Sequence, residues 1–298
     1  MSFSKFCTII EPVKKPEVLL IDFSNLAMRC LFSLPFDPLD ENFNRWKILM
    51  MGSLKKTFIK FNPDKVIFCL EGHNNWRKLV YTDYKANRVY GPPTDANHID
   101  FDIFFGEMQR FIKSFSSFLT NVQFLSVDRC EADDLIGVIV KSHPEWNITC
   151  QSSDRDFYQL YKYSNYKQYD GIKKKIIEVL DPKMYLLEKV ITGDAGDNVP
   201  KLKTGIGQKR AAAIINSSDG LDEWLKKENL EKEFERNMKL ISFDCIPEEI
   251  SFNINKAVND WNSIPFDPKK TMNFLIENKL TAMFDDFEVF INIFQKIK

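Results

Sequence analysis

Short apolar runs alternate with longer segments of helical periodicity along the first two thirds of the chain. Strand-like apolar runs occupy residues 18–22, 66–71, 122–127 and 147–153. Apolar positions recur at helical spacing in residues 24–34, 43–61, 99–119 and 182–192. Alternation of buried strands with amphipathic helices is typical of βαβ units. The pattern therefore predicts an α/β fold with a central, mostly parallel sheet flanked by helices.

Three regions depart from this alternation and define the expected organisation. Residues 1–16 are polar and contain two prolines, so we expect a polar tail before an α/β core at residues 17–192. Residues 73–98 interrupt the core without a strand pattern. Beyond the core the chain is charged and reads as helical, so we expect a helical region at residues 193–298.

Two smaller features refine this organisation. A turn at Asp170 and Gly171 predicts a hairpin of two short strands, and we interpret its lysines, residues 173–175, as a solvated edge. The acidic amphipathic segment 284–294 fits either docking on the core or binding a partner, and we favour docking.

Carboxylates stand where strands and helices end. They are Asp22, Glu71, Glu131, Asp133, Asp134, Asp154, Asp156, Asp194 and Asp197. Three of them, residues 131–134, open a helix, where acidic side chains often serve only to cap free N–H groups. However, the carboxyl ends of parallel strands share one edge of a sheet, so we expect the whole set to converge there.

Convergent carboxylates repel one another unless cations neutralise them. Oxygen ligands without a cluster of His or Cys favour magnesium or manganese over zinc. The histidines, His73, His98 and His143, are scattered along the chain, which argues against a His-based metal or nucleophile site. The sequence therefore predicts a divalent-metal site, and a pair of such ions promotes in-line displacement at a phosphodiester.

Two basic segments indicate contact with nucleic acid. Residues 76–90 carry Arg77, Lys78, Lys85 and Arg88 with aromatic residues between them, which suits a single strand, although a solvated charged loop fits equally well. Further along, a glycine turn at Gly205 and Gly207 lies between two predicted helices, and its basic neighbours are Lys203, Lys209 and Arg210. Backbone N–H groups at such a turn can hold a duplex phosphate.

Composition limits the remaining classes. A hydrophobic content of 44% supports a sizeable core, and no segment has the length and apolar character of a membrane span. The first residues lack the apolar run of a signal peptide, so we expect a cytoplasmic protein. Six cysteines occur without a CxxC pair and are expected to be reduced packing residues. The net charge of −1 is small because acidic and basic residues nearly balance, but they are concentrated in separate segments of the chain.

Six motifs follow one another in a characteristic order. They are Leu-Ile-Asp-Phe-Ser (20–24), Tyr-Lys-Ala-Asn-Arg (84–88), Glu-Ala-Asp-Asp (131–134), Ser-Ser-Asp-Arg-Asp-Phe (152–157), Gly-Asp-Ala-Gly-Asp-Asn (193–198) and Gly-Ile-Gly (205–207). This order resembles the 5′-nuclease or flap-endonuclease family, in particular its phage ribonuclease H subgroup. The resemblance implies a PIN-like nuclease core, a helical arch at about 73–98 and a helix-three-turn-helix at about 198–216.

The resemblance also implies two groups of metal ligands. The first group is Asp22, Glu71, Glu131, Asp133 and Asp154, and the second is Asp134, Asp156, Asp194 and Asp197. The expected cofactor is a pair of Mg²⁺ ions, for which Mn²⁺ can substitute. Glu71 stands where the family usually has Asp.

The same resemblance implies substrate-binding and catalytic roles for several basic and aromatic residues. Lys85 and Arg88 match arch residues that contact the scissile phosphate, and Tyr84 matches one that stacks on a base. Lys189 matches a further active-site lysine. The hairpin at 198–216 is expected to grip duplex DNA and to bind K⁺, although residues 201–204 stand where the family usually has another glycine.

The resulting hypothesis is a structure-specific 5′ nuclease with 5′ to 3′ exonuclease and flap endonuclease activity. The expected substrates are RNA or DNA 5′ ends on flap, forked or nicked duplex DNA and on RNA–DNA hybrid, cut by two-metal hydrolysis. Resemblance to the phage enzymes implies primer removal during DNA replication, a monomer, and a single-strand-binding protein as a partner.

Two other classes remain open at this point. A PIN-like ribonuclease acting on single-stranded RNA shares the acidic sheet edge but does not need the hairpin at 198–216. A structure-specific DNA-binding protein with an inactive site is the second alternative. Cleavage of a flap but not of single-stranded RNA would exclude the first, and binding without metal-dependent cleavage would support the second.

Overall fold

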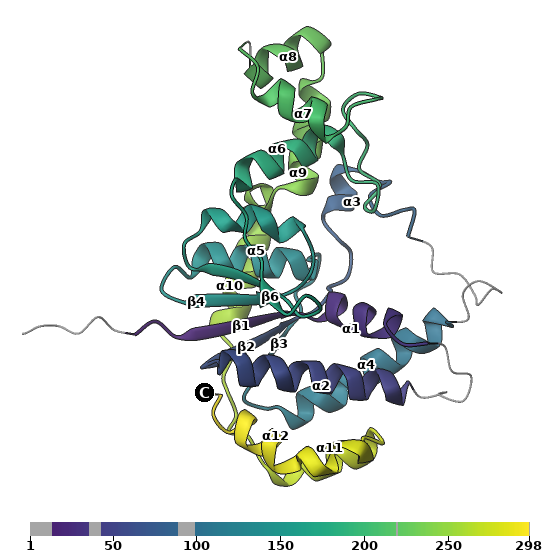
Figure 1. Cartoon of the computed structure of the whole chain (residues 1–298), viewed down its shortest axis with the longest axis vertical. Helices are drawn as coiled ribbons and strands as arrows, with labels where there is room; N and C mark the ends of the chain where they lie inside the picture. Colours follow the sequence, from purple (N-terminus) through teal and green to yellow (C-terminus); the bar gives the residue numbers. More distant parts are fainter. Residues whose placement is uncertain (1–13, 36–42, 89–98, 219, 298) are drawn as a thin grey trace, which may run out of the picture.

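A single sheet forms the centre of the molecule. The computed structural model describes residues 14–35, 43–88, 99–218 and 220–297 (Figure 1). The strands are β1 (Glu17–Asp22), β2 (Lys65–Cys69), β3 (Gln123–Leu125), β4 (Asn147–Gln151), β5 (Tyr166–Asp170) and β6 (Lys175–Ile176). Within the described residues they form one sheet in the order β3-β2-β1-β4-β5-β6. Neighbouring strands are parallel except for the β5–β6 hairpin, which confirms both the predicted sheet and the predicted hairpin.

Helices from both ends of the chain cover one face of the sheet. They are α1 (Phe23–Phe32), α2 (Asn44–Phe61), α4 (Phe101–Phe118), α11 (Lys269–Glu277), the 3-10 helix η3 (Thr281–Asp286) and α12 (Phe287–Phe294). Alternate residues of β1, Leu19 and Ile21, point into this aromatic-rich core. The ring of Phe294 in α12 packs edge-on against Phe58 in α2, with centroids 5.7 Å apart. The final acidic helix therefore docks on the core, as its apolar face predicts.

The opposite face is covered by α5 (Ala132–Ser142), α10 (Glu248–Asn259) and the 3-10 helices η1 (Asp156–Lys162) and η2 (Phe243–Cys245). The other set of alternate β1 residues, Val18 and Leu20, is buried here. The sheet thus lies between two helical layers, with α11 and α12 beneath the lower one (Figure 1).

A group of helices extends upward from the side of the sheet that is covered by α5 (Figure 1). It contains α6 (Pro182–Thr192), α7 (Gln208–Ile215), α8 (Gly220–Glu228) and α9 (Glu231–Ile241). The loop from α6 to α7 is anchored by Ile206, which is fully buried against Ile191 and Leu202. Because Gly205 adopts a positive φ of 81°, the chain can reverse there. The hairpin consists of α6, the loop 193–207 and α7, so only its second helix lies within the predicted range 198–216.

The predicted arch is described only in part. Its base contains the short helix α3 (Arg77–Val80), followed by turns up to Arg88. Residues 89–98, the remainder of the segment, lie outside the described residues, as do residues 1–13 of the predicted tail.

Cysteine burial agrees with the prediction of reduced packing residues. Cys30, Cys69, Cys130 and Cys150 are buried free thiols, and Cys245 is half-buried. Cys7 lies outside the described residues. Within the described part of the chain, no helix is long and apolar enough to span a membrane.

Candidate active site

A cavity of about 1030 Å³ lies where the direction of strand order reverses. From β1 the chain proceeds to β2 and β3 on one side and then returns to β4 on the other. Loops at the carboxyl ends of β1 and β4 diverge at such a point and leave a crevice, which is where open α/β sheets bind ligands. Asp22 ends β1 and Asp154 follows β4, so both face this crevice.

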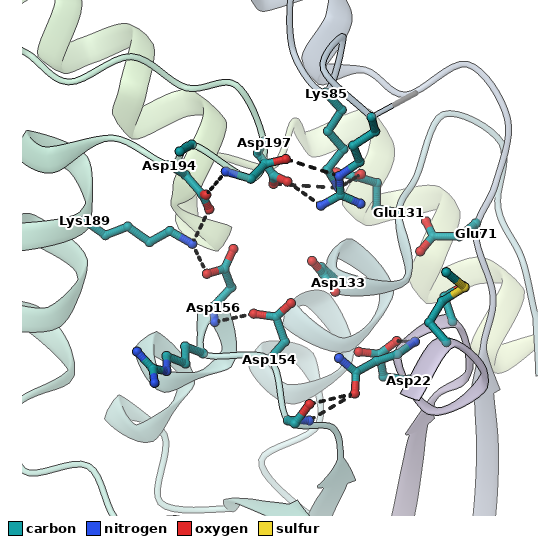
Figure 2. Close-up of a pocket in the computed structure, with 18 of the residues that line it drawn as sticks. Asp22, Glu71, Lys85, Glu131, Asp133, Asp154, Asp156, Lys189, Asp194 and Asp197 are labelled. Carbon is teal, nitrogen blue, oxygen red and sulfur yellow. Dashed lines mark hydrogen bonds and ion pairs between the residues drawn. The ribbon is translucent and has the colours of Figure 1, made fainter. Parts of the chain in front are cut away.

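Eight of the nine predicted carboxylates line the cavity. They are Asp22, Glu71, Glu131, Asp133, Asp154, Asp156, Asp194 and Asp197 (Figure 2). Asp133 and Asp154 point toward one another in its centre (Figure 2). Asp156, Asp194 and Asp197 each offer one oxygen, and these oxygens lie within 4.8 Å of one another. Residues from 22 to 197 in the sequence are therefore gathered into one acidic site.

Local backbone geometry fixes several of these side chains. Asp22 caps α1, because its Oδ1 accepts the N–H of Asn25 at 3.1 Å. Its other oxygen, Oδ2, accepts the hydroxyl of Ser152 at 2.8 Å, which ties the end of β1 to the end of β4. Asp154 Oδ1 accepts the N–H of Asp156 at 2.9 Å and so sets the two carboxylates side by side.

Burial and mutual repulsion raise the pKa values of the central carboxyls. Burial raises the pKa of Asp22 to about 7, with added repulsion from Glu71 and Asp154. The pKa of Asp133 lies well above its usual value because of burial and then Asp154 and Asp22. Burial likewise raises the pKa of Asp156 to about 6. Crowded oxygen ligands with excess negative charge suit hard divalent cations, so the donor set fits a metal site.

Three basic side chains balance part of this charge. Lys189 contacts Asp156 and lies 2.8 Å from Asp194. Lys85 contacts Glu131, and Arg88 contacts Asp197. Although burial opposes it, attraction to Glu131 raises the pKa of Lys85 to about 12. All three predicted catalytic cations thus line the acidic cavity. Figure 2 shows Lys85 and Lys189 on opposite sides of it.

Three residues with predicted contacts to metal or nucleic acid are buried in the structure. Asp134, expected as a metal ligand, is fully buried away from the cavity and accepts two hydrogen bonds from Arg77. Arg77, expected to bind DNA, is itself buried. The ring of Tyr84, expected to stack on a base, is buried, and its hydroxyl lies 3.0 Å from both Glu131 and Asp197. Tertiary packing thus places these three side chains in the interior of the protein, paired with other protein groups.

The hairpin residues lie on the surface. Lys203, Gly205, Gly207, Lys209 and Arg210 are all exposed at the loop and the first turn of α7. Lys203 pairs with Glu228 of α8. Gln208, the first residue of α7, lines the cavity, so the exposed hairpin adjoins the acidic site.

Three further polar residues, Ser152, Asn25 and Arg155, belong to the site and were not predicted from the sequence. Ser152 fixes Asp22, and Asn25 accepts hydrogen bonds from both the N–H and the hydroxyl of Ser153. Arg155, which lies between Asp154 and Asp156 in the sequence, also lines the cavity. The available signal was position: Ser152 and Arg155 lie inside the motif at 152–157, and Asn25 is the residue after the motif at 20–24.

Gly193 controls the loop that carries Asp194 and Asp197. It ends α6 with φ 67° and ψ −175°, a conformation that is essentially restricted to glycine. A Cβ atom there would lie 2.4 Å from the carbonyl oxygen of Val199, which pairs with the N–H of Asp194. We expect Gly193→Ala to lower the free energy of unfolding by at least about 1–3 kcal/mol.

Chemical denaturation of the purified variants measures this loss. Gly52→Ala is the matched control, because its Cβ would meet nothing within 4 Å in α2. That variant is expected to gain about 0.5–1 kcal/mol, since alanine is the better helix former. Equal effects of the two substitutions would contradict the assigned role of Gly193.

The fold and the cavity together define a class of protein. A mostly parallel sheet that gathers a dense cluster of carboxylates and several basic side chains at one crevice is the architecture of a metal-dependent α/β nuclease. Residues 17–190, more than half of the chain, match the family model described as 5′-3′ exonuclease, N-terminal resolvase-like domain. The chain belongs to this family.

Individual relatives agree with this assignment. Ribonuclease H of Enterobacteria phage T4 is 29% identical over 301 residues, which cover 92% of this chain and 96% of that protein. Flap endonuclease Xni of Shewanella piezotolerans is 26% identical over 66% of this chain and 75% of that enzyme. The crystal structure of the bacteriophage T5 D15 flap endonuclease with DNA and metal ions has a TM-score of 0.63 at 19% identity, covering 88% of this chain and 99% of that one. The fold is thus shared with that nuclease.

Proposed function

We propose that this chain is a structure-specific 5′ nuclease, acting as 5′ to 3′ exonuclease and flap endonuclease on RNA or DNA 5′ ends of duplex DNA. The observation that carries the proposal is the adjacency of the acidic cavity to the exposed hairpin of α6 and α7. A single-strand ribonuclease needs the cavity alone. An enzyme that cuts at a junction needs both a cleavage site and a nearby grip on the duplex.

The carboxylates would hold two divalent ions, with Mg²⁺ preferred and Mn²⁺ as a substitute. One group consists of Asp22, Glu71, Glu131, Asp133 and Asp154, and the other of Asp156, Asp194 and Asp197. When bound, such ions activate water and offset charge on a phosphodiester. Lys85 and Arg88 on one side of the cavity and Lys189 on the other are placed to stabilise charge that develops on the phosphate. The expected products carry a 5′-phosphate and a 3′-hydroxyl.

The duplex would lie against the exposed hairpin. Backbone N–H groups at the start of α7 and the charges of Lys209 and Arg210 suit phosphate oxygens. A K⁺ ion in the loop around Gly205 and Gly207 would add to this contact. Because these groups recognise the backbone and not base edges, we expect structural and not sequence specificity.

Similarity to the phage enzyme supports a proposal for the biological setting. We propose removal of primers during phage DNA replication in the host cytoplasm, as a monomer, beside a single-strand-binding protein. In this proposal residues 17–192 form the nuclease core and residues 193–298 the helical region that positions the duplex.

Cleavage of a 5′-flap duplex labelled at either end tests the function. Magnesium-dependent products at the flap junction, with single-stranded RNA of the same length left intact, are the expected result. Cutting of the RNA alone would replace the proposal by a PIN-like ribonuclease. Tight flap binding without cleavage under Mg²⁺ or Mn²⁺ would indicate a binding protein.

Lys85→Ala is expected to lower the single-turnover cleavage rate by about 10²- to 10³-fold, because a cation at the phosphate acts mainly in the transition state. Flap affinity, measured by fluorescence anisotropy in Ca²⁺, should change far less. Lys113→Ala removes the same charge from an exposed position on α4 and is the matched control. A rate within twofold of the wild-type rate for Lys85→Ala would contradict the catalytic role.

A further inference from the structure

A buried ion pair lies behind the acidic cavity. The guanidinium of Arg77 donates from Nη2 to Asp134 Oδ1 at 2.7 Å and from Nη1 to Oδ2 at 3.0 Å. The Arg77 side chain is 3% exposed and that of Asp134 is 0% exposed. Two parallel hydrogen bonds fix the relative orientation of the two groups as well as their distance.

The Arg77–Asp134 ion pair joins three distant segments. Arg77 Nε donates to the carbonyl oxygen of Leu240, in the last turn of α9, at 2.8 Å. Asp134 Oδ2 accepts the N–H of Glu131 at 2.9 Å and the indole N–H of Trp76 at 3.2 Å. The base of the arch segment, the start of α5 and the end of α9 are thereby held together through buried polar contacts.

The same contacts determine how Glu131 faces the cavity. Oε2 of Glu131 accepts from Arg77 Nη1 and from the Tyr84 hydroxyl, each at 3.0 Å. The other oxygen, Oε1, contacts Lys85, which lines the cavity (Figure 2). One oxygen of Glu131 is therefore committed to the protein interior, and the other is presented to the cavity.

Lys85 depends on the same arrangement. It lies eight residues after Arg77, and its N–H donates to the carbonyl oxygen of Asp197 at 2.9 Å. Tyr84, next to it, bridges Glu131 and Asp197. A shift of the arch base at Arg77 would consequently move Lys85 relative to both carboxylates.

We propose that Arg77 and Asp134 are positioning residues for the nuclease reaction. Their ion pair presents Glu131 Oε1 to the cation site and places the segment that bears Lys85 and Arg88. The inference rests on the proposed function of the cavity, and it assigns neither residue a contact with metal or nucleic acid. Charges buried this deeply are costly to desolvate, which is consistent with a role in fixing geometry and not in adding stability.

Arg77→Lys tests the proposal, because lysine keeps the charge but cannot form the two parallel hydrogen bonds. Binding of Mn²⁺ to the metal-free protein, followed by electron paramagnetic resonance, is expected to weaken by about 10- to 100-fold, as for other groups that orient metal ligands. The cleavage kcat should fall by a similar factor, while KM for the flap and its salt dependence stay unchanged. Arg110→Lys, on the exposed face of α4, is the matched control.

The same measurements distinguish the positioning role of Arg77 from the nuclease function on which it rests. Unchanged Mn²⁺ affinity and kcat in Arg77→Lys would overturn the positioning role, provided the wild type binds Mn²⁺ and cuts. A raised KM with a reduced salt slope would also overturn it, since that result marks a phosphate contact. Failure of the wild type to bind Mn²⁺ or to cut would instead refute the proposed function itself. If Arg77→Lys does not fold, Asp134→Asn, which keeps the shape of the side chain, replaces it in the same measurements.

Discussion

Asp133→Asn is expected to abolish cleavage and at the same time to stabilise the metal-free protein. Asp133 points into the centre of the cavity toward Asp154 (Figure 2). As a proposed ligand of the divalent ions, Asp133 should contribute several kcal/mol to lowering the activation barrier, so we expect the single-turnover rate to fall by at least about 10³-fold.

The gain in stability has the same origin. Burial and repulsion from Asp154 and Asp22 raise the pKa of Asp133 well above its usual value, which means that the charged form is destabilised in the folded protein. An uncharged amide removes this repulsion. We expect a gain of about 1–3 kcal/mol in the free energy of unfolding, typical of substitutions that relieve a strained active site.

Two measurements on one variant check these opposite effects. Cleavage is followed under single-turnover conditions with Mg²⁺, and unfolding is followed with urea in the presence of a chelator. Asp260→Asn, an exposed position at the end of α10, is the control that should change neither quantity. A destabilised, inactive Asp133→Asn protein would point to a structural role for this carboxylate.

Metal-free stability is expected to fall as the pH rises from about 4.5 to 7. The folded-state pKa of Asp22, about 7, lies above its ordinary value of 3.8, and that of Asp156 is about 6. Between these limits the folded protein binds more protons than the unfolded chain, so stability decreases with rising pH. Glu131 has the opposite sign, but its stabilisation develops between its folded-state pKa of about 2 and its ordinary value of 4.5, so it is nearly constant across this window.

The magnitude follows from the size of the shifts. A change of one pKa unit corresponds to about 1.4 kcal/mol, so we expect a loss on the order of 2–4 kcal/mol across the window. We expect divalent ions to reverse this loss of stability, because ions bound at the proposed site of the folded protein would contribute about 2.7 kcal/mol at a concentration of 100 times Kd. Stabilisation by Mg²⁺ should therefore be much larger at pH 7.5 than at pH 5.

Urea unfolding at both pH values, with chelator or with Mg²⁺, measures this dependence. Asp22→Asn should lose part of the pH effect, since it removes one of the titrating groups. Equal stability at pH 5 and pH 7.5 without metal would show that the carboxylates do not repel one another in the folded protein.

Local pattern was sufficient to predict the sheet and the acidic site. The continuous apolar run of β1, which is buried on both faces, and the helical periodicity in α2, α4 and α6 are local properties, so these elements could be placed within a few residues. Asp22 and Asp154 could be assigned to one crevice because parallel strands share a carboxyl edge. The resemblance to 5′ nucleases then supplied Lys189, whose position no local pattern specifies.

The burial of side chains in the basic segment at residues 76–88 could not be predicted from local sequence. Its composition fits a nucleic-acid contact and a solvated loop equally well, yet Trp76, Arg77 and Tyr84 are buried. The partners that make this burial possible are far away in sequence. The Arg77 side chain bonds Leu240, 163 residues further along, and the Tyr84 hydroxyl bonds Asp197, 113 residues further along.

The sequence by itself determined which elements form, where the carboxylates lie on them and, through its ordered motifs, the class of enzyme. Only the tertiary structure decided which charged groups face the cavity and which are paired in the interior. Asp133 and Asp134 are adjacent in sequence, yet one lines the cavity and the other is buried against Arg77. The chemical type of a side chain belongs to the sequence, whereas its solvation and its partners depend on distant segments that only the folded chain brings together.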